Sequence, residues 1–157
     1  MYRVDEFLRR FQGAALITDE KNIYYLTGFT GEGSLLITPK RAIIITDFRY
    51  VEQCERQAPE CELCRTKAGL SRDGAVKQAL DDEGIDELFI EDNVFTVQSY
   101  KKLEAEVSGV KLSPIDDTCR AMRVVKGAEE LSYSAKALEI SCVAFENMLK
   151  QLRSGIT

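Results

Sequence analysis

Hydrophobic residues follow helical spacing near the N-terminus and then gather in short apolar runs. Val4, Phe7, Leu8 and Phe11 recur at i, i+3, i+4 and i+7, which predicts a helix over residues 2–12. The apolar runs that follow are short enough to be buried strands. Strands are predicted at residues 14–18, 34–38, 42–46, 62–66, 87–91 and 110–114.

Helical patterns lie between most of these strands. They are predicted from Asp47, as an N-cap, through residue 57, and over residues 71–84 and 96–107. Residues 19–22 are interpreted as a polar connection, and no element is assigned to residues 23–26. Pro39-Lys40-Arg41 separates two apolar runs in the manner of a hairpin. Strands that alternate with helices predict an α/β fold, with a mixed sheet and helices on its faces.

The last part of the chain, from Asp116, is predicted to be helical with a break near Gly127. An apolar stripe follows one face of this helix. It comprises Leu131, Leu138, Phe145 and Leu152, spaced seven apart, flanked by Ala135, Cys142 and Leu149. The stripe packs either against its own domain or against a part that this chain lacks. Because the pattern runs into the final "LRSGIT", we expect a domain taken from a longer protein.

Composition narrows the classes of partner. A chain of 157 residues with 45% hydrophobic residues fits one ordinary core. Its net charge of −5 gives no overall attraction to nucleic acid or to anionic lipid. No apolar run approaches the roughly 20 residues that span a bilayer, and the N-terminus lacks a signal-peptide pattern. We therefore expect a cytoplasmic protein with no nucleic-acid partner and no membrane contact.

The sequence contains no histidine, which limits its chemistry. The Ser-His-Asp and Cys-His systems and the commonest metal ligand are excluded, while Asp, Glu, Lys and Tyr remain. Cys61 and Cys64 form a CxxC pair, but residues three apart on a strand point to opposite faces. No second pair completes a zinc site. We predict structural cysteines in a reducing compartment, and no metal in this chain.

The glycine-rich stretch "NIYYLTGFTGEGSLLIT", residues 22–38, superficially resembles a phosphate-binding loop. A dinucleotide fingerprint requires a third glycine and a following helix, whereas a strand follows here. A P-loop requires lysine where this chain has Ser34. Two interpretations remain. The glycines either form a tight turn with positive φ, or shape a loop that presents Phe29, Thr30 and Glu32 to a partner or ligand.

Three motifs together resemble the N-terminal domain of the creatinase/prolidase/aminopeptidase P family. They are NxxYLTGF within the glycine-rich stretch, DxRY at residues 47–50, and KxxEE at residues 126–130, with "LRSGIT" after them. The resemblance implies a ribonuclease-H-like α/β/α fold around a mixed sheet. It assigns residues 1–126 to the N-terminal domain and residues 127–157 to a linker helix that leads into an absent catalytic domain.

The resemblance also implies a function. The parent protein would be a Xaa-Pro aminopeptidase or dipeptidase whose C-terminal domain holds two divalent ions, manganese, cobalt or zinc. This chain would be its non-catalytic half and inactive alone, with no catalytic residue and no cofactor of its own. Its partners would be its own catalytic domain and a second copy in a homodimer. Its loops would close the partner subunit's active site over short Xaa-Pro peptides.

The resemblance places candidate contacts with substrate or partner subunit on the loop after NxxYLTGF and on DxRY. The candidates are Tyr25, Phe29, Thr30, Glu32, Arg49 and Tyr50. A carboxylate such as that of Glu32 suits a substrate ammonium, and Phe29 suits an apolar side chain. For the DxRY residues the alternative is structural: an arginine paired with Asp47 or Asp92, and a core tyrosine.

Two other functions remain open. A freestanding or non-peptidase relative of the same fold, such as a histone-chaperone subunit or a creatine-hydrolysing enzyme, would make this chain a peptide- or protein-binding module. A nuclease related to ribonuclease H would need clustered carboxylates around magnesium. The candidates for that cluster are Asp19, Asp47, Glu91 and Asp92. The acidic net charge argues against the nuclease.

Overall fold

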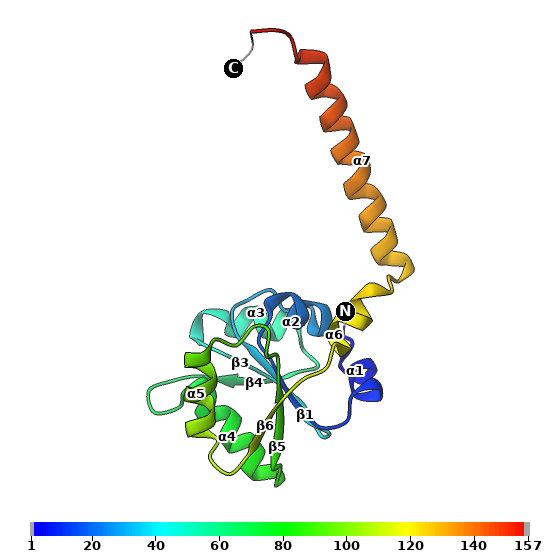
Figure 1. The fold of residues 1–157 in the computed structure, drawn as a ribbon. Coiled ribbons are helices and arrows are strands. Elements are labelled where there is room, and N and C mark those ends of the chain that lie inside the picture. The colour runs from blue at the N-terminus through cyan, green and yellow to red at the C-terminus, as the bar shows by residue number, and fades with distance from the viewer. Residues whose placement is uncertain (1, 156–157) are drawn as a thin grey trace. The chain divides into compact units, whose positions relative to one another are not determined.

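The computed structural model describes residues 2–155. They divide into two compact units, the first ending at Met122 and the second beginning at Arg123. The first unit holds the sheet and the second holds a long helix (Figure 1). The expected domain boundary at residues 126–127 rests on the family linker and stays a prediction.

The first unit contains a six-stranded mixed sheet in the order β4-β3-β2-β1-β5-β6. The strands are β1 (Ala14–Ile17), β2 (Ser34–Ile37), β3 (Ala42–Thr46), β4 (Glu62–Arg65), β5 (Glu87–Ile90) and β6 (Lys111–Pro114). The pairs β1–β2 and β2–β3 are antiparallel, which confirms the predicted hairpin. The pairs β3–β4, β1–β5 and β5–β6 are parallel. All six strands coincide with predicted segments.

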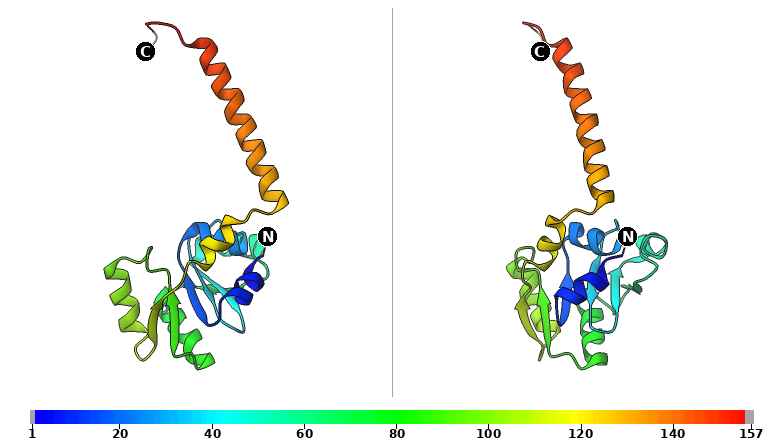
Figure 2. Two further views of the ribbon diagram at one scale, coloured as in Figure 1. Left: turned by 45° about the vertical axis from the view of Figure 1, so that its right-hand side comes forward. Right: turned by 90° about the vertical axis from the view of Figure 1, so that its right-hand side faces the viewer.

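Helices cover both faces of this sheet (Figure 2). The helices of the first unit are α1 (Val4–Arg10), α2 (Glu20–Thr27), η1 (Phe48–Tyr50), α3 (Val51–Gln57), α4 (Arg72–Glu83), α5 (Val97–Glu106) and α6, which begins in it (Thr118–Val124). Helix α7 (Ala128–Gln151) belongs to the second unit. One apolar cluster joins the sheet to α1, α2, α3 and α6, and a second joins it to α4 and α5. The predicted α/β/α layering with a mixed sheet is confirmed.

Helix α2 corrects the interpretation of residues 19–22 as a connection. Asp19 caps the helix by accepting a hydrogen bond from the amide of Lys21, and Gly28 ends it with a left-handed φ of 82°. Ile23 and Leu26 are buried on its inner face. The helix is only two turns long, so its apolar spacing gives a weak signal. The two caps are the stronger signal in the sequence.

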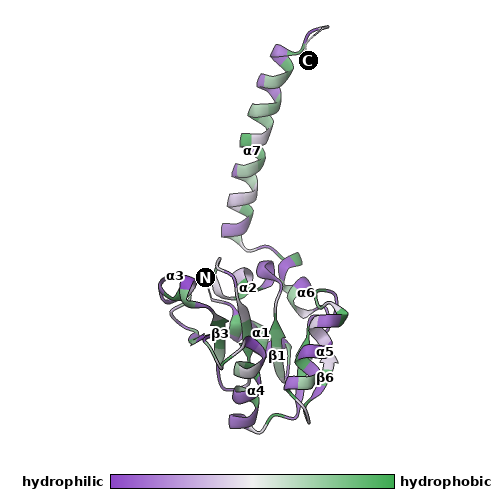
Figure 3. Cartoon of the chain, turned by 90° about the vertical axis from the view of Figure 1, so that its left-hand side faces the viewer, coloured by the Kyte–Doolittle hydropathy of each residue, from purple (hydrophilic) through white to green (hydrophobic). Residues whose placement is uncertain are grey.

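The second unit consists mainly of α7, which begins after Gly127 as predicted. The carboxylate of Glu130 accepts a hydrogen bond from the Gly127 amide at 2.8 Å and caps the helix. No residue of α7 is buried, so the apolar stripe is exposed along the helix. Figure 3 shows apolar and polar residues mixed along α7, whereas the central strands are predominantly apolar.

Candidate functional site

The candidate site lies where β3 ends and β2 begins. Because these strands are antiparallel, with Ser34 opposite Ile45, the loop over residues 28–33 lies beside the turn over residues 47–50. The loop carries the end of the NxxYLTGF motif and the turn carries DxRY. Two motifs that are separate in the sequence therefore form one surface.

The start of the loop is anchored in the core. The Thr27 hydroxyl donates to the carbonyl of Ile23 at 2.8 Å and accepts from the Phe29 amide at 3.1 Å. The Phe29 side chain is only 1% exposed, and its ring meets Tyr50 edge-on with centroids 6.5 Å apart. These contacts give the loop a fixed starting direction.

Gly31 and Gly33 are required by close packing and not by a left-handed backbone conformation. Neither has positive φ, in contrast to Gly28. A Cβ on Gly31 would lie 2.5 Å from the Phe29 ring and 2.7 Å from the Tyr50 ring. A Cβ on Gly33 would lie 2.8 Å from the carbonyl oxygen of Ile45. The expected turn with positive φ is therefore confirmed for Gly28 alone.

Arg49 lies at the centre of the charged part of the site. Its guanidinium donates to Asp47 at 2.7 Å and to Glu32 at 3.0 Å, and it also lies over the Tyr50 ring. The hydrogen bonds from Arg49 lower the pKa of Asp47, and those to Asp47 raise the pKa of Arg49. Two carboxylates against one guanidinium leave this cluster with a net charge of −1. The predicted pairing of Arg49 with Asp47 is confirmed.

A neutral hydrogen-bonded network holds the other side of the loop. Gln57 accepts from the Thr30 amide at 3.0 Å, and Gln53 donates to the Thr30 hydroxyl at 2.8 Å. Helix α3, which follows DxRY, therefore binds both the backbone amide and the side-chain hydroxyl of Thr30. These contacts hold Thr30 in place, and Gly31 next to it is buried.

The predicted site residues divide into exposed and packed groups. Thr30, Glu32 and Arg49 are exposed at the surface. Tyr25 and Tyr50 are partly buried, and the Tyr25 hydroxyl donates to the carbonyl of Met122 at 2.9 Å. The expectation that Phe29 is presented to a ligand is corrected, because its side chain fills the core beneath the loop.

Sequence reasoning overlooked Phe48 as a candidate. Its side chain is 75% exposed, and it lies within DxRY between Asp47 and Arg49. An aromatic residue close to the end of an apolar strand suggests core packing, so the sequence alone gave no reason to place it outside. The site therefore offers an exposed aromatic ring beside its charged cluster.

The carboxylates proposed for a nuclease do not converge. Glu91 is 3% exposed and accepts hydrogen bonds from the amides of Thr18 and Asp19 and from the Asn22 side chain. Its oxygens are thus committed to the protein. Asp19 caps α2, and among residues 2–155 no three acidic, cysteine or histidine side chains form a group able to hold a metal ion. The nuclease interpretation has no support in this geometry.

Four of the five cysteines are buried or partly buried in the first unit, whereas Cys142 is exposed on α7. Cys61 packs against the cluster beneath α3, whereas Cys64 packs against the cluster on the opposite face, as the strand period predicts. Burial raises the pKa of Cys54 to about 11 and that of Cys61 to about 12. Thiols with such pKa values are poor nucleophiles at neutral pH.

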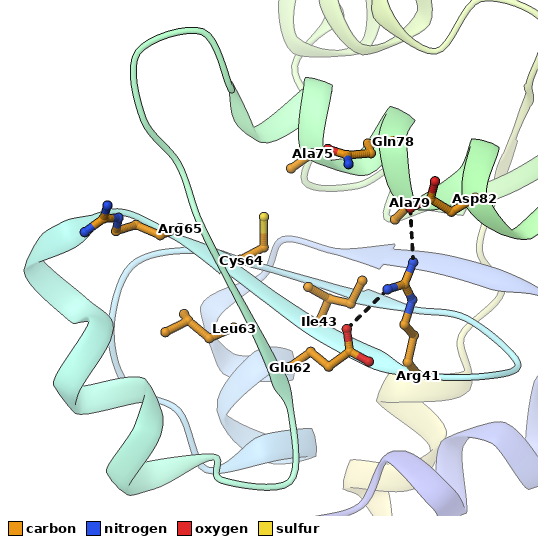
Figure 4. Close-up of a pocket in the computed structure, with 10 residues that line it drawn as sticks. All are labelled: Arg41, Ile43, Glu62, Leu63, Cys64, Arg65, Ala75, Gln78, Ala79 and Asp82. Carbon is orange, nitrogen blue, oxygen red and sulfur yellow. Dashed lines mark hydrogen bonds and ion pairs between the residues drawn. The ribbon is translucent and has the colours of Figure 1, made fainter.

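A separate hollow of about 310 Å³ lies between edge strand β4 and helix α4 (Figure 4). Arg41 spans one side, donating to Glu83 at 2.7 Å and to Glu62 at 3.3 Å, with Asp82 at 3.9 Å. The remaining wall includes small side chains of α4, Ala75 and Ala79. The hollow contains no residue of the three sequence motifs.

The family assignment rests on sequence and structure together. The sequence model of the Creatinase/Prolidase N-terminal domain matches residues 6–125. The uncharacterized peptidase YqhT of Bacillus subtilis is 33% identical over 143 residues, covering 90% of this chain and 40% of that protein. An uncharacterized peptidase of Staphylococcus aureus is 28% identical and is covered over 44% of its length. The chain thus spans less than half the length of these curated relatives.

Among the helices described within residues 2–155, none combines the length and the apolar character needed to cross a membrane.

Solved structures agree with this assignment. A Xaa-Pro dipeptidase from Bacillus anthracis superposes with a TM-score of 0.92 at 29% identity, over 99% of this chain and 44% of that one. An X-Pro aminopeptidase from Thermotoga maritima gives a TM-score of 0.85 at 28% identity, over 98% and 45%. The N-terminal domain of the peptidase PepQ from Mycobacterium tuberculosis gives 0.64 at 28% identity, over 75% and 92%. The chain belongs to the creatinase/prolidase N-terminal domain family.

Proposed function

We propose that this chain is the non-catalytic N-terminal part of a cytoplasmic, metal-dependent Xaa-Pro aminopeptidase or dipeptidase. The observation that carries the proposal is the superposition of 99% of the chain, α7 included, on 44% of a Xaa-Pro dipeptidase. Two divalent ions, manganese, cobalt or zinc, would be held by a C-terminal catalytic domain. The described residues offer no cluster for them, and the five cysteines, none of which forms a disulfide, fit a reducing compartment.

Helix α7 supports the presence of that catalytic domain. Leu131, Leu138 and Phe145 are 58%, 64% and 57% exposed, although they lie on one face of the helix. Exposed apolar surface of this extent marks an interface. Its partner in this proposal is the protein's own catalytic domain, with α7 as the linker helix.

The loop over residues 28–33 and the DxRY turn form the contact to a second subunit. In the proposed homodimer this surface lies over the partner's active site and limits it to short proline-containing peptides. The support is geometric: Glu32 and Arg49 are accessible, and the loop beneath them is fixed by Phe29, Gly31 and Tyr50. A rigid, accessible loop positions contacts without a large ordering cost on binding.

The test uses the full-length protein loaded with manganese, cobalt or zinc. Peptides Xaa-Pro and Xaa-Pro-Xaa are compared with the matched peptides in which alanine replaces proline. We expect metal-dependent cleavage before proline only, lost on chelation and restored by metal. Tight binding of these peptides without turnover would contradict the proposal and favour the non-peptidase binding module.

A further inference from the structure

The exposed ring of Phe48 has no structural role in the first unit. Phe48 is 75% exposed, the largest exposed fraction among the large hydrophobic residues at positions 2–122. Buried Phe29 and half-buried Tyr50, two residues away, form the core contact of this region. Leaving a phenyl ring in water is unfavourable, so a ligand that covers this ring gains free energy of binding.

The turn that carries Phe48 is held rigidly. Asp47 accepts a hydrogen bond from the Arg49 amide at 2.9 Å and binds the Arg49 guanidinium through both oxygens. Arg49 also donates to Glu32 at 3.0 Å, which joins the turn to the loop over residues 28–33. An exposed aromatic residue on a fixed turn is typical of side chains that contribute most of the energy of a contact.

The net charge of the side chains next to Phe48 indicates the charge of the ligand. Asp47, Arg49 and Glu32 sum to −1, and one oxygen of Glu32 accepts no hydrogen bond from another described residue. The site therefore combines a net negative cluster with an apolar ring. A ligand of complementary chemistry carries an ammonium directly beside an apolar side chain, as the N-terminal residue of a peptide does.

We infer that Phe48 is a specificity-determining residue that contacts the apolar side chain of the peptide's N-terminal residue, while Glu32 faces its ammonium. This inference rests on the proposed function, in which the surface covers a partner subunit's active site. Phe48 takes the role that the sequence suggested for Phe29, since the ring of Phe29 is buried.

The experiment compares Phe48→Ala, Phe48→Leu and Val97→Ala in the full-length, metal-loaded protein. Val97 is 74% exposed and lies on α5, so its truncation removes an equally exposed hydrophobic residue elsewhere. The substrates are Leu-Pro and Gly-Pro peptides of equal length, and kcat and KM are measured separately.

We expect Phe48→Ala to lower kcat/KM for the Leu-Pro peptide about tenfold, mainly through KM, because a lost apolar contact weakens binding. The Gly-Pro peptide should change by less than about threefold, Phe48→Leu should recover part of the loss, and Val97→Ala should match wild type. An equal effect on both peptides, or none, would overturn the role of Phe48 while leaving the peptidase intact. Wild-type protein without Xaa-Pro cleavage would overturn the proposed function and this inference together.

Discussion

The Asn22 side-chain amide donates to the Glu91 carboxylate at 2.6 Å, joining helix α2 to the end of β5 across 69 residues of chain. The other Glu91 oxygen accepts from the amides of Thr18 and Asp19 at 2.6 and 2.7 Å. A carboxylate that is 3% exposed would be unfavourable without these donors. The first residue of the NxxYLTGF motif is thereby explained as a contact that positions α2.

Replacing Asn22 with Ala should lower the free energy of unfolding by about 1–3 kcal/mol, because it removes a hydrogen bond to a buried charge. Chemical denaturation of residues 1–157 measures the change. The matched control is Asn93→Ala, since Asn93 is exposed two residues after Glu91 and its side chain makes no hydrogen bond within residues 2–155. Equal stability of both variants would contradict the role of Asn22.

Gly31→Ala should destabilise the domain by about 1–3 kcal/mol through overpacking, because the new methyl group meets two aromatic rings. Those rings are Phe29 and Tyr50, at 2.5 and 2.7 Å. Gly127→Ala is the control, since its Cβ would meet only the Glu130 carboxylate at 3.5 Å. Thermal unfolding distinguishes them, and a wild-type midpoint for Gly31→Ala would show that the loop packs differently.

The buried thiols make stability depend on alkaline pH. Both have an ordinary pKa of 9.0, and burial raises it to about 11 for Cys54 and about 12 for Cys61. The unfolded chain therefore loses these protons before the folded protein does. Their contribution to stability is fully present below pH 9 and is lost as the pH rises towards 11 and 12.

Unfolding measured at about pH 8 and about pH 10 tests this direction. Wild type should be less stable at the higher pH, and a Cys54→Ala/Cys61→Ala double variant should lose less stability over the same interval. A double variant with an unchanged pH dependence would assign the effect to other groups, such as Tyr2, whose pKa is also raised by burial.

The apolar stripe of α7 can be tested without changing the core of the first unit. In the full-length protein, Leu138→Ser should lower the unfolding midpoint of the catalytic domain or expose apolar surface to dye, because Leu138 would lose a buried contact. Lys136→Ser is the control, since Lys136 lies on the opposite face and forms an exposed ion pair with Glu139 at 2.8 Å. Identical behaviour of the two variants would contradict packing through this stripe.

The sequence predicts regular elements well where their periodicity is long or their apolar runs are dense. The strands β1, β2 and β3 are dense apolar runs, and α7 repeats its stripe over 24 residues. The edge strands β4 and β6 have a mixed composition, and their alternation with helices indicated them. Helix α2 was overlooked because its buried residues span only two turns, although Asp19 and Gly28 mark both of its ends. Caps were the informative signal there.

Site residues were predictable only as far as local motifs reach. The pair Asp47 and Arg49 lies within one turn, so its contact follows from spacing. The burial of Phe29 depends on its tertiary contact with Tyr50 beside Gly31, which no local pattern contains. The same holds for the exposure of Phe48, which follows from the placement of the turn on the sheet. The Glu91 contacts depend on the parallel pairing of β1 with β5, and sequence separation hides them.

Mixed dimers test most directly whether the loop over residues 28–33 and the DxRY turn act on the active site of a second subunit. One full-length subunit carries Glu32→Ala and Arg49→Ala with an intact metal site, and the other has an intact surface but disabled metal ligands. Each homodimer should be nearly inactive on Xaa-Pro peptides. Because half of randomly mixed dimers pair one of each, activity should recover to about a quarter of wild type. No recovery, in mixtures shown by mass to contain the mixed dimer, would contradict an action across subunits.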